Sequence, residues 1–209
     1  AFAQKNKDEP DVKSGKVLTY HDFGVIGGAK VLGLQIEMGS TPRGGSAVAV
    51  ANALNETKAR YIILVGIAFG MDCQEQHIGD ILVSQKLSLY EVRKISVDEK
   101  GEKIEIKRGD TAPASEEILG KFKAWSSSKY WFGAAVHFGL LLSGEKLINN
   151  PDFKSKLQKE YPEAIGGEME AAGAYAAAEF VKCDWIVVKA VCDYADGNKD
   201  QDKEKNQET

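Results

Sequence analysis

Apolar residues occur along this chain in short runs that are separated by glycine, proline and polar residues. The run at residues 61–65, Tyr-Ile-Ile-Leu-Val, is continuously apolar, which is typical of a strand buried on both faces of a sheet. Two further runs flank Gly27 and Gly28 with the spacing of a hairpin. The pattern predicts strands at residues 16–23, 29–38, 60–66, 80–90, 132–142 and 185–192.

Other segments have the residue spacing of helices. Some are preceded by a polar residue that can cap the first helical turn, such as Ser115 or Asn150. The predicted helices cover residues 46–55, 115–125, 152–160 and 168–181. Because strands alternate with helices, we expect an α/β fold with three layers, in which helices flank a mixed central sheet.

Three segments are too polar to belong to a core. Residues 1–15 are predicted to be a linker or the remnant of a helix, and residues 98–108 are predicted to be an exposed ribbon. Residues 196–209 are nearly all polar, which predicts a solvated or disordered tail. With 209 residues, the chain has the length of one domain, residues 1–209.

Composition and charge narrow the classes of function. The formal net charge is −4 and the isoelectric point is near 5.5, whereas nucleic-acid binders are basic, so we expect no nucleic-acid partner. No apolar run reaches the ~18 residues of a membrane span, so no membrane contact is expected. Cys73, Cys183 and Cys192 lack a CxxC spacing, which favours reduced thiols in a cytoplasmic protein. We expect neither a metal nor a cofactor.

Two carboxylate motifs carry the candidate chemistry. The sequence GGEMEAAG places Glu168, Met169 and Glu170 at the start of a predicted Ala-rich helix. Asp193 ends the apolar run of a predicted buried strand, and open α/β sheets bind their ligands at the carboxyl ends of strands. Each motif has a structural alternative, because acids are favourable at a helix N-terminus and an Asp can simply cap a turn.

Four short motifs follow one another in a characteristic order over roughly residues 30–197. They are VGIAFG with the later GDILV, then LSGEKLI, then EMEAA, and finally VKAVCD. This set resembles the nucleoside phosphorylase and nucleosidase superfamily, which includes purine and uridine phosphorylases and methylthioadenosine/adenosylhomocysteine nucleosidases. The variants GIAFG, SGEKL, GGEME and CDYADGNK are most similar to the phosphorylase-like effector domains of multidomain bacterial signalling and defence proteins.

The resemblance implies a role for each motif. Asp193 is expected to be the catalytic residue that protonates or hydrogen-bonds the purine ring nitrogen as the base leaves, and burial is expected to raise its pKa. Glu170 is expected to bind the ribose hydroxyls, with Met169 against the sugar and Glu168 as a second polar wall. The other substrate-binding residues that the family implies are Ala68, Phe69, Gly70 and Leu147.

Departures from the family pattern bear on the nucleophile. The loop at residues 66–70 lacks the serine with which phosphorylases hold phosphate. The two acids expected in the pocket would also repel a phosphate anion. Water is therefore the expected nucleophile. Arg43 and Lys146 are the candidate phosphate-binding residues, among basic residues such as Lys189 that are expected on loops. Cys192 replaces a serine just before the catalytic acid, which is expected to remove a good hydrogen bond.

The leading hypothesis is hydrolysis of the N-glycosidic bond of a purine nucleoside or nucleotide, a small-molecule substrate. The alternatives are a phosphate-dependent phosphorylase with the same pocket, and a nucleotide-sensing module that has lost catalysis. The family's first strand and last helix are expected to be missing from residues 1–209, so no water-activating residue is named. A homodimer or higher homo-oligomer is also implied, with Tyr90, Trp125 and Trp131 as candidate interface residues.

Overall fold

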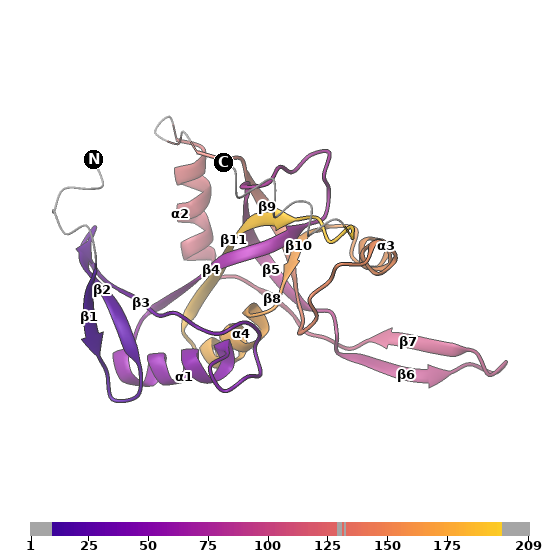
Figure 1. Ribbon diagram of the computed structural model, residues 1–209, viewed down its shortest axis with the longest axis horizontal. Coiled ribbons are helices and arrows are strands. Elements are labelled where there is room, and N and C mark those ends of the chain that lie inside the picture. Colours follow the sequence, from indigo (N-terminus) through magenta and orange to yellow (C-terminus); the bar gives the residue numbers. More distant parts are fainter. Residues whose placement is uncertain (1–9, 129–130, 132, 198–209) are drawn as a thin grey trace.

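The computed structural model describes residues 10–128, 131 and 133–197, and Figure 1 shows how their elements are arranged. The strands are β1 (Asp11–Ser14), β2 (Thr19–Ile26), β3 (Ala29–Gly33), β4 (Tyr61–Gly70), β5 (Ile81–Leu89), β6 (Arg93–Val97), β7 (Lys103–Lys107), β8 (Thr111–Pro113), β9 (Val136–Ser143), β10 (Ala164–Glu168) and β11 (Asp184–Asp193). The helices are α1 (Ser46–Thr57), α2 (Glu116–Ser126), α3 (Pro151–Glu160) and α4 (Ala171–Val181).

Six strands form the central sheet, in the order β11-β4-β10-β9-β5-β8. β11 runs parallel to β4, and β9 runs parallel to both β10 and β5. β10 is antiparallel to β4, and β8 is antiparallel to β5. A further antiparallel pairing joins β11 to β5, so β11, β4, β10, β9 and β5 close into a ring. The mixed central sheet confirms the predicted fold class.

The four helices surround this sheet. α1 and α4 pack against each other on one side of it, α2 stands against β11, and α3 lies near β10 at the far end (Figure 1). Small residues let α4 approach closely, since its buried positions are Ala171, Gly173, Ala174, Ala177 and Ala178. Among the described residues, no helix has the length and apolar character that a membrane crossing requires.

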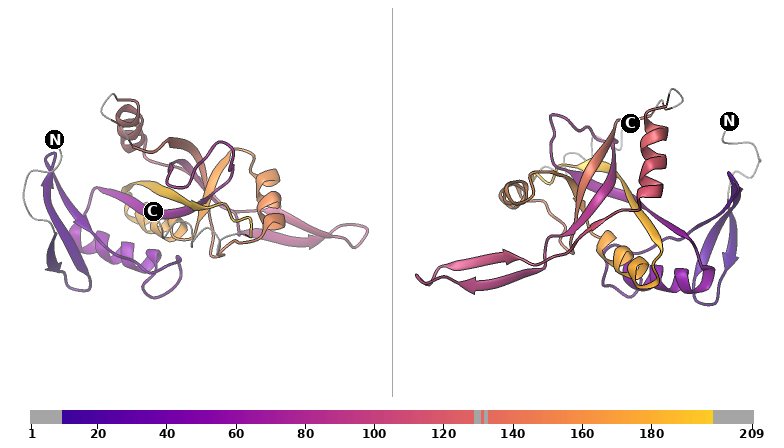
Figure 2. Two further views of the ribbon diagram at one scale, coloured as in Figure 1. Left: turned by 45° about the horizontal axis from the view of Figure 1, so that its top comes forward. Right: turned by 180° about the vertical axis from the view of Figure 1, so that it is seen from behind.

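The hairpin predicted at residues 16–23 and 29–38 exists, but it lies outside the central sheet. Its strands are β2 and β3 of a separate three-stranded sheet, which stands to one side of the molecule in both views of Figure 2. Only Tyr20 is buried in β2, so the hairpin offers no apolar face for the core. The linker predicted at residues 1–15 is wrong for Asp11–Ser14, which is strand β1 although all of its side chains are exposed.

Strand β10 is absent from the predicted elements. Its sequence, AIGGE, contains two glycines, and glycine weakens a strand interior. The glycine at residue 167 is required because Phe69 lies across it: a β-carbon there would be 2.4 Å from the Phe69 ring. Glu168 therefore ends a strand, and the helix predicted to begin there begins at Ala171 instead.

The exposed ribbon predicted at residues 98–108 is present, and it begins earlier, at Arg93. β6 and β7 pair as a two-stranded ribbon that projects from the body of the protein (Figure 2). Its base is held by Arg93, whose guanidinium lies 2.6 Å from the Glu160 carboxylate. Asn150 caps α3 as predicted, since its side chain accepts a hydrogen bond from the Phe153 amide.

Several remaining predictions need adjustment. β9 begins at Val136 rather than at residue 132. Residue 132 lies outside the described residues, and so do residues 1–9 of the predicted linker and residues 198–209 of the predicted tail. Tyr90 is a core residue, 2% exposed, and is therefore unsuited to an oligomer interface. Trp125 is half-exposed, and its ring packs on that of Trp131.

Replacing Gly173 by alanine is expected to destabilise the fold, because a β-carbon there would lie 2.4 Å from Ser46 Oγ and 2.6 Å from the Ala47 nitrogen, where α4 meets α1. Overpacking of this kind costs about 1–3 kcal/mol. Gly120 in α2 is the matched control: a β-carbon meets nothing within 4 Å, so Gly120→Ala should stabilise by about 0.5–1 kcal/mol. Urea unfolding measures both free energies, and equal changes would contradict the close contact of α1 and α4.

Candidate active site

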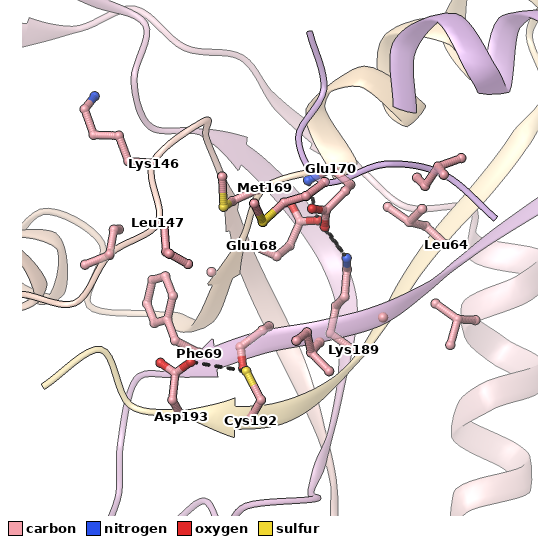
Figure 3. A pocket seen from close by; sticks show the side chains of 18 of the residues that line it. Leu64, Phe69, Lys146, Leu147, Glu168, Met169, Glu170, Lys189, Cys192 and Asp193 are labelled. Carbon is pink, nitrogen blue, oxygen red and sulfur yellow. Dashed lines mark hydrogen bonds and ion pairs between the residues drawn. The ribbon is translucent and has the colours of Figure 1, made fainter. Parts of the chain in front are cut away.

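A cavity of about 340 Å³ opens at the carboxyl ends of β4 and β11. Its wall combines segments that are far apart in sequence: residues 36–38, 64–69, 146–148 and 167–170, with Lys189, Cys192 and Asp193 of β11. Figure 3 shows two groups of polar side chains in it, Asp193 with Cys192 at one end and the two glutamates with Lys189 at the other. The cavity thus presents carboxylates at two separate places.

Asp193 closes one end of the cavity and is only 3% exposed. Its Oδ1 accepts a hydrogen bond from the Ala195 amide at 2.9 Å. The Cys192 thiol lies 3.2 Å from Asp193 Oδ2 and 3.4 Å from the Ala68 carbonyl oxygen. The thiol is therefore placed as a donor to the carboxylate, although a weaker one than the serine hydroxyl that it replaces.

Glu168, Glu170 and Lys189 form a buried ion cluster at the other end (Figure 3). Lys189 Nζ lies 2.8 Å from Glu170 Oε2 and 3.1 Å from Glu168 Oε2. Burial by itself favours the neutral amine, but the two carboxylates outweigh it and raise the pKa of Lys189 above its usual value. The ammonium of Lys189 therefore neutralises one of the two acids.

Backbone groups hold both glutamates in place. Glu168 accepts hydrogen bonds from the amide of Glu170 at 3.0 Å and from that of the next residue at 2.9 Å, which satisfies two free amides at the start of α4. Glu170 Oε1 accepts from the Gly39 amide at 3.1 Å. The next residue, Ser40, donates its hydroxyl to the carbonyl of Met169 at 3.1 Å. The loop before α1 therefore orients the whole Glu-Met-Glu motif.

Most of the residues predicted to bind substrate line the cavity, namely Ala68, Phe69, Leu147, Glu168, Met169 and Glu170. Gly70 is not part of the lining, because its position faces the Gln76 side chain. Lys146 lies at the rim and pairs with Glu91. Arg43 is exposed and lies outside the cavity wall.

Two parts of the wall are missing from the predicted site. Lys189 lies in β11 and not on a loop, so its predicted position is wrong. The signal for it is a lysine inside an apolar strand, because a buried charge needs a partner and the neighbouring motif has two acids. Residues 36–38 follow the end of β3 and face β4 across the cavity. Because Lys189 neutralises one acid, the cavity repels a second anion less than the acids alone predict.

Known proteins resemble this chain in sequence. A family model for the phosphorylase superfamily matches residues 1–209. A death domain-containing ATP nucleosidase from Amphimedon queenslandica is 37% identical over 183 residues, which are 78% of this chain and 33% of that protein. A 5′-methylthioadenosine/S-adenosylhomocysteine nucleosidase from Glaesserella parasuis is 28% identical over 174 residues, 83% of this chain and 72% of that enzyme. The chain therefore spans about a third of the first relative.

Solved structures share the fold. A 5′-methylthioadenosine/S-adenosylhomocysteine nucleosidase from Neisseria meningitidis, in complex with methylthio-immucillin-A, gives a TM-score of 0.76 at 20% identity over 95% of this chain and 82% of that one. A futalosine hydrolase from Helicobacter pylori gives a TM-score of 0.74 at 16% identity over 94% and 80%. At these identities the similarity concerns the fold alone.

Lys189→Met is expected to lower the free energy of unfolding by about 3–5 kcal/mol, because it leaves two buried carboxylates without their cation. Lys146→Met is the matched control: its partner is also a glutamate, but the lysine is exposed, so the loss should be about 0–1 kcal/mol. Chemical denaturation at neutral pH measures both. A loss in Lys189→Met no larger than in the control would show that the ion cluster does not hold the site together.

Proposed function

We propose, since the chain belongs to the phosphorylase superfamily, that it hydrolyses the N-glycosidic bond of a purine nucleoside or nucleotide. One observation carries this proposal: a single cavity holds a buried carboxyl group, Asp193, at one end and a lysine-paired carboxylate, Glu170, at the other. A nucleoside has a base that needs a proton and a sugar whose hydroxyls need an acceptor. The two ends of the cavity match these two requirements.

Asp193 acts on the base. As the bond from the ribose C1′ to the purine nitrogen breaks, its electron pair moves onto the base, and the proton of the Asp193 carboxyl group is transferred to a ring nitrogen. The base then leaves as a neutral molecule. Water adds its oxygen to C1′ and loses a proton to the solvent, from which the Asp193 carboxyl group is protonated again. Stabilising charge where it develops is the largest contribution that such a site can make to the rate.

Glu170 acts on the sugar. Its carboxylate accepts hydrogen bonds from the ribose hydroxyls and favours the positive charge that develops at C1′. Lys189 and the Gly39 amide hold this carboxylate in one orientation, so less entropy is lost when the sugar binds. Met169 offers its thioether to the sugar, and Phe69 offers its ring to the base.

Water is favoured over phosphate as the nucleophile. The segment 66–70 has no hydroxyl donor, and Arg43 stands outside the cavity wall. Phosphorolysis remains the second candidate, because Lys189 reduces the negative charge of the cavity. A module that binds nucleotides without turnover is the third, and it predicts ligand binding without release of base.

The names of two relatives support a narrower substrate class. One is called an ATP nucleosidase and another a 5′-methylthioadenosine/S-adenosylhomocysteine nucleosidase, and the substrates in both names contain adenine. An adenine nucleoside or nucleotide is therefore the proposed substrate. Leu147 lies on the Asp193 side of the cavity, where the base would bind (Figure 3).

A homo-oligomer in the cytoplasm completes the proposal. Phe180, 89% exposed, and its half-exposed neighbour Val181 lie at the end of α4, beside a hollow between α1 and α4. An apolar surface of this kind is typical of protein contacts. All three cysteines are free thiols, which suits a reducing compartment.

Asp193→Asn is expected to lower the rate of base release by about 10²–10⁴, because an amide has no acidic proton to give to the departing base. The matched control is Asp152→Asn on the exposed surface of α3, which should leave the rate unchanged. Chromatography of the free base from an adenine nucleoside and nucleotide panel measures both. Equal rates in the two variants would remove Asp193 from the reaction.

Base release is also expected to proceed at the same rate in phosphate-free buffer as in phosphate. Water already supplies the nucleophile, and both lysines of the cavity wall are paired with carboxylates, Lys189 with Glu168 and Glu170 and Lys146 with Glu91. The sugar product should be the free sugar, or its 5′-phosphate when the substrate is a nucleotide. A requirement for phosphate, with a sugar 1-phosphate as the product, would replace hydrolysis by phosphorolysis.

A further inference from the structure

Helix α3 carries a lysine on its buried face. Lys154 is only 8% exposed and lies with Leu157 on the side of the helix that faces the protein, whereas Lys156 and Lys159 are exposed. Within the described residues, its ammonium makes no hydrogen bond or ion pair and lies 5.7 Å from the centre of the Tyr194 ring. A buried cation of this kind is unfavourable unless other charges compensate it.

Acidic groups approach Lys154 from two neighbouring segments. Asp72 and Cys73 follow β4, and Asp193 and Asp196 belong to the end of β11 and the turn after it. Burial lowers the pKa of Lys154 below its usual value, while the three aspartates act through space to keep the ammonium charged. The ammonium lies on the ring of Tyr194, the residue next to Asp193, so its charge is close to the candidate catalytic acid.

The turn that carries Asp193 is strained and anchored. Ala195 has a φ of 52°, a left-handed conformation that is uncommon for any residue but glycine. The Tyr194 hydroxyl donates to a backbone carbonyl of the segment after β4 at 2.7 Å. The Gly197 amide donates to the segment just before α3 at 3.1 Å. Lys154 therefore lies where α3 meets this turn and contacts the ring that anchors it.

We propose that Lys154 is a positioning residue whose buried charge holds the Asp193 turn against α3 and stabilises the carboxylate that Asp193 becomes once it has protonated the base. The inference rests on the proposed function, in which that proton moves from Asp193 to the leaving purine. After the transfer, a negative charge stays on Asp193, and the ammonium stabilises it through space. Cys192 contacts the same carboxylate from β11 but brings no positive charge.

The test is the pH dependence of kcat/KM for base release. In Lys154→Met, the alkaline limb of the profile is expected to move up by about one pH unit, because Asp193 loses a nearby cation and keeps its proton to higher pH. Lys154→Arg keeps the charge and should leave the limb near that of the wild type. Lys159→Met, on the exposed side of α3, should not move it.

Two results would overturn the inference. One is an unchanged alkaline limb in folded Lys154→Met; the other is an equal shift in Lys154→Arg, which would trace the effect to packing and not to charge. Lys154→Gln takes the place of Lys154→Met if that variant does not fold.

A second readout separates this inference from the proposed function. If the wild type releases no base, the proposed function fails, but the Asp193 carboxyl carbon can still be titrated by NMR in the wild type and in Lys154→Met. An upward shift of that titration in the variant supports the coupling without any turnover. Coincident titrations overturn it.

Discussion

A buried ammonium between two carboxylates is the contact on which the rest of the site depends. Lys189 reaches out of β11, Glu168 ends β10, and Glu170 stands just before α4, so one ion cluster joins the two strands that flank β4 and the start of a helix. Unpaired charges are very costly in a dry interior, so these three elements cannot shift independently. The position of the carboxylate at the sugar end of the cavity is therefore a consequence of how the fold pairs its charges.

The same principle separates the two ends of the cavity. Glu170 stands beside a cation and accepts a hydrogen bond from a backbone amide, which suits a carboxylate that stays ionised and binds hydroxyl groups. Asp193 is buried beside the Cys192 thiol and the Ala195 amide, and Lys154 of α3 lies on the ring of the next residue, Tyr194. Two carboxyl groups in different surroundings can take different roles in one reaction.

The sequence pattern predicts the fold class, most of the central strands and the cavity-lining motifs, because each has a strong local signal. An apolar run, interrupted only by Lys189, identifies the β11 strand and places Asp193 at its end. The β2–β3 hairpin also has a local signal, but its exclusion from the central sheet depends on long-range pairing that no local pattern contains. Lys189 is visible as a residue type, and only the spatial arrangement shows that it pairs with Glu168 and Glu170.

The failures of local prediction share one physical cause. Local patterns do not predict strand β10 because it contains two glycines, and one of them is needed so that Phe69 can lie across the strand beside the cavity. Ala195 adopts a glycine-like conformation, and the turn that contains it ends the strand of the candidate acid. Residues with poor local propensity therefore gather where the chain must bring a ring or a carboxylate to one place. At these positions the tertiary requirements of the site outweigh local preference, and local patterns are least informative there.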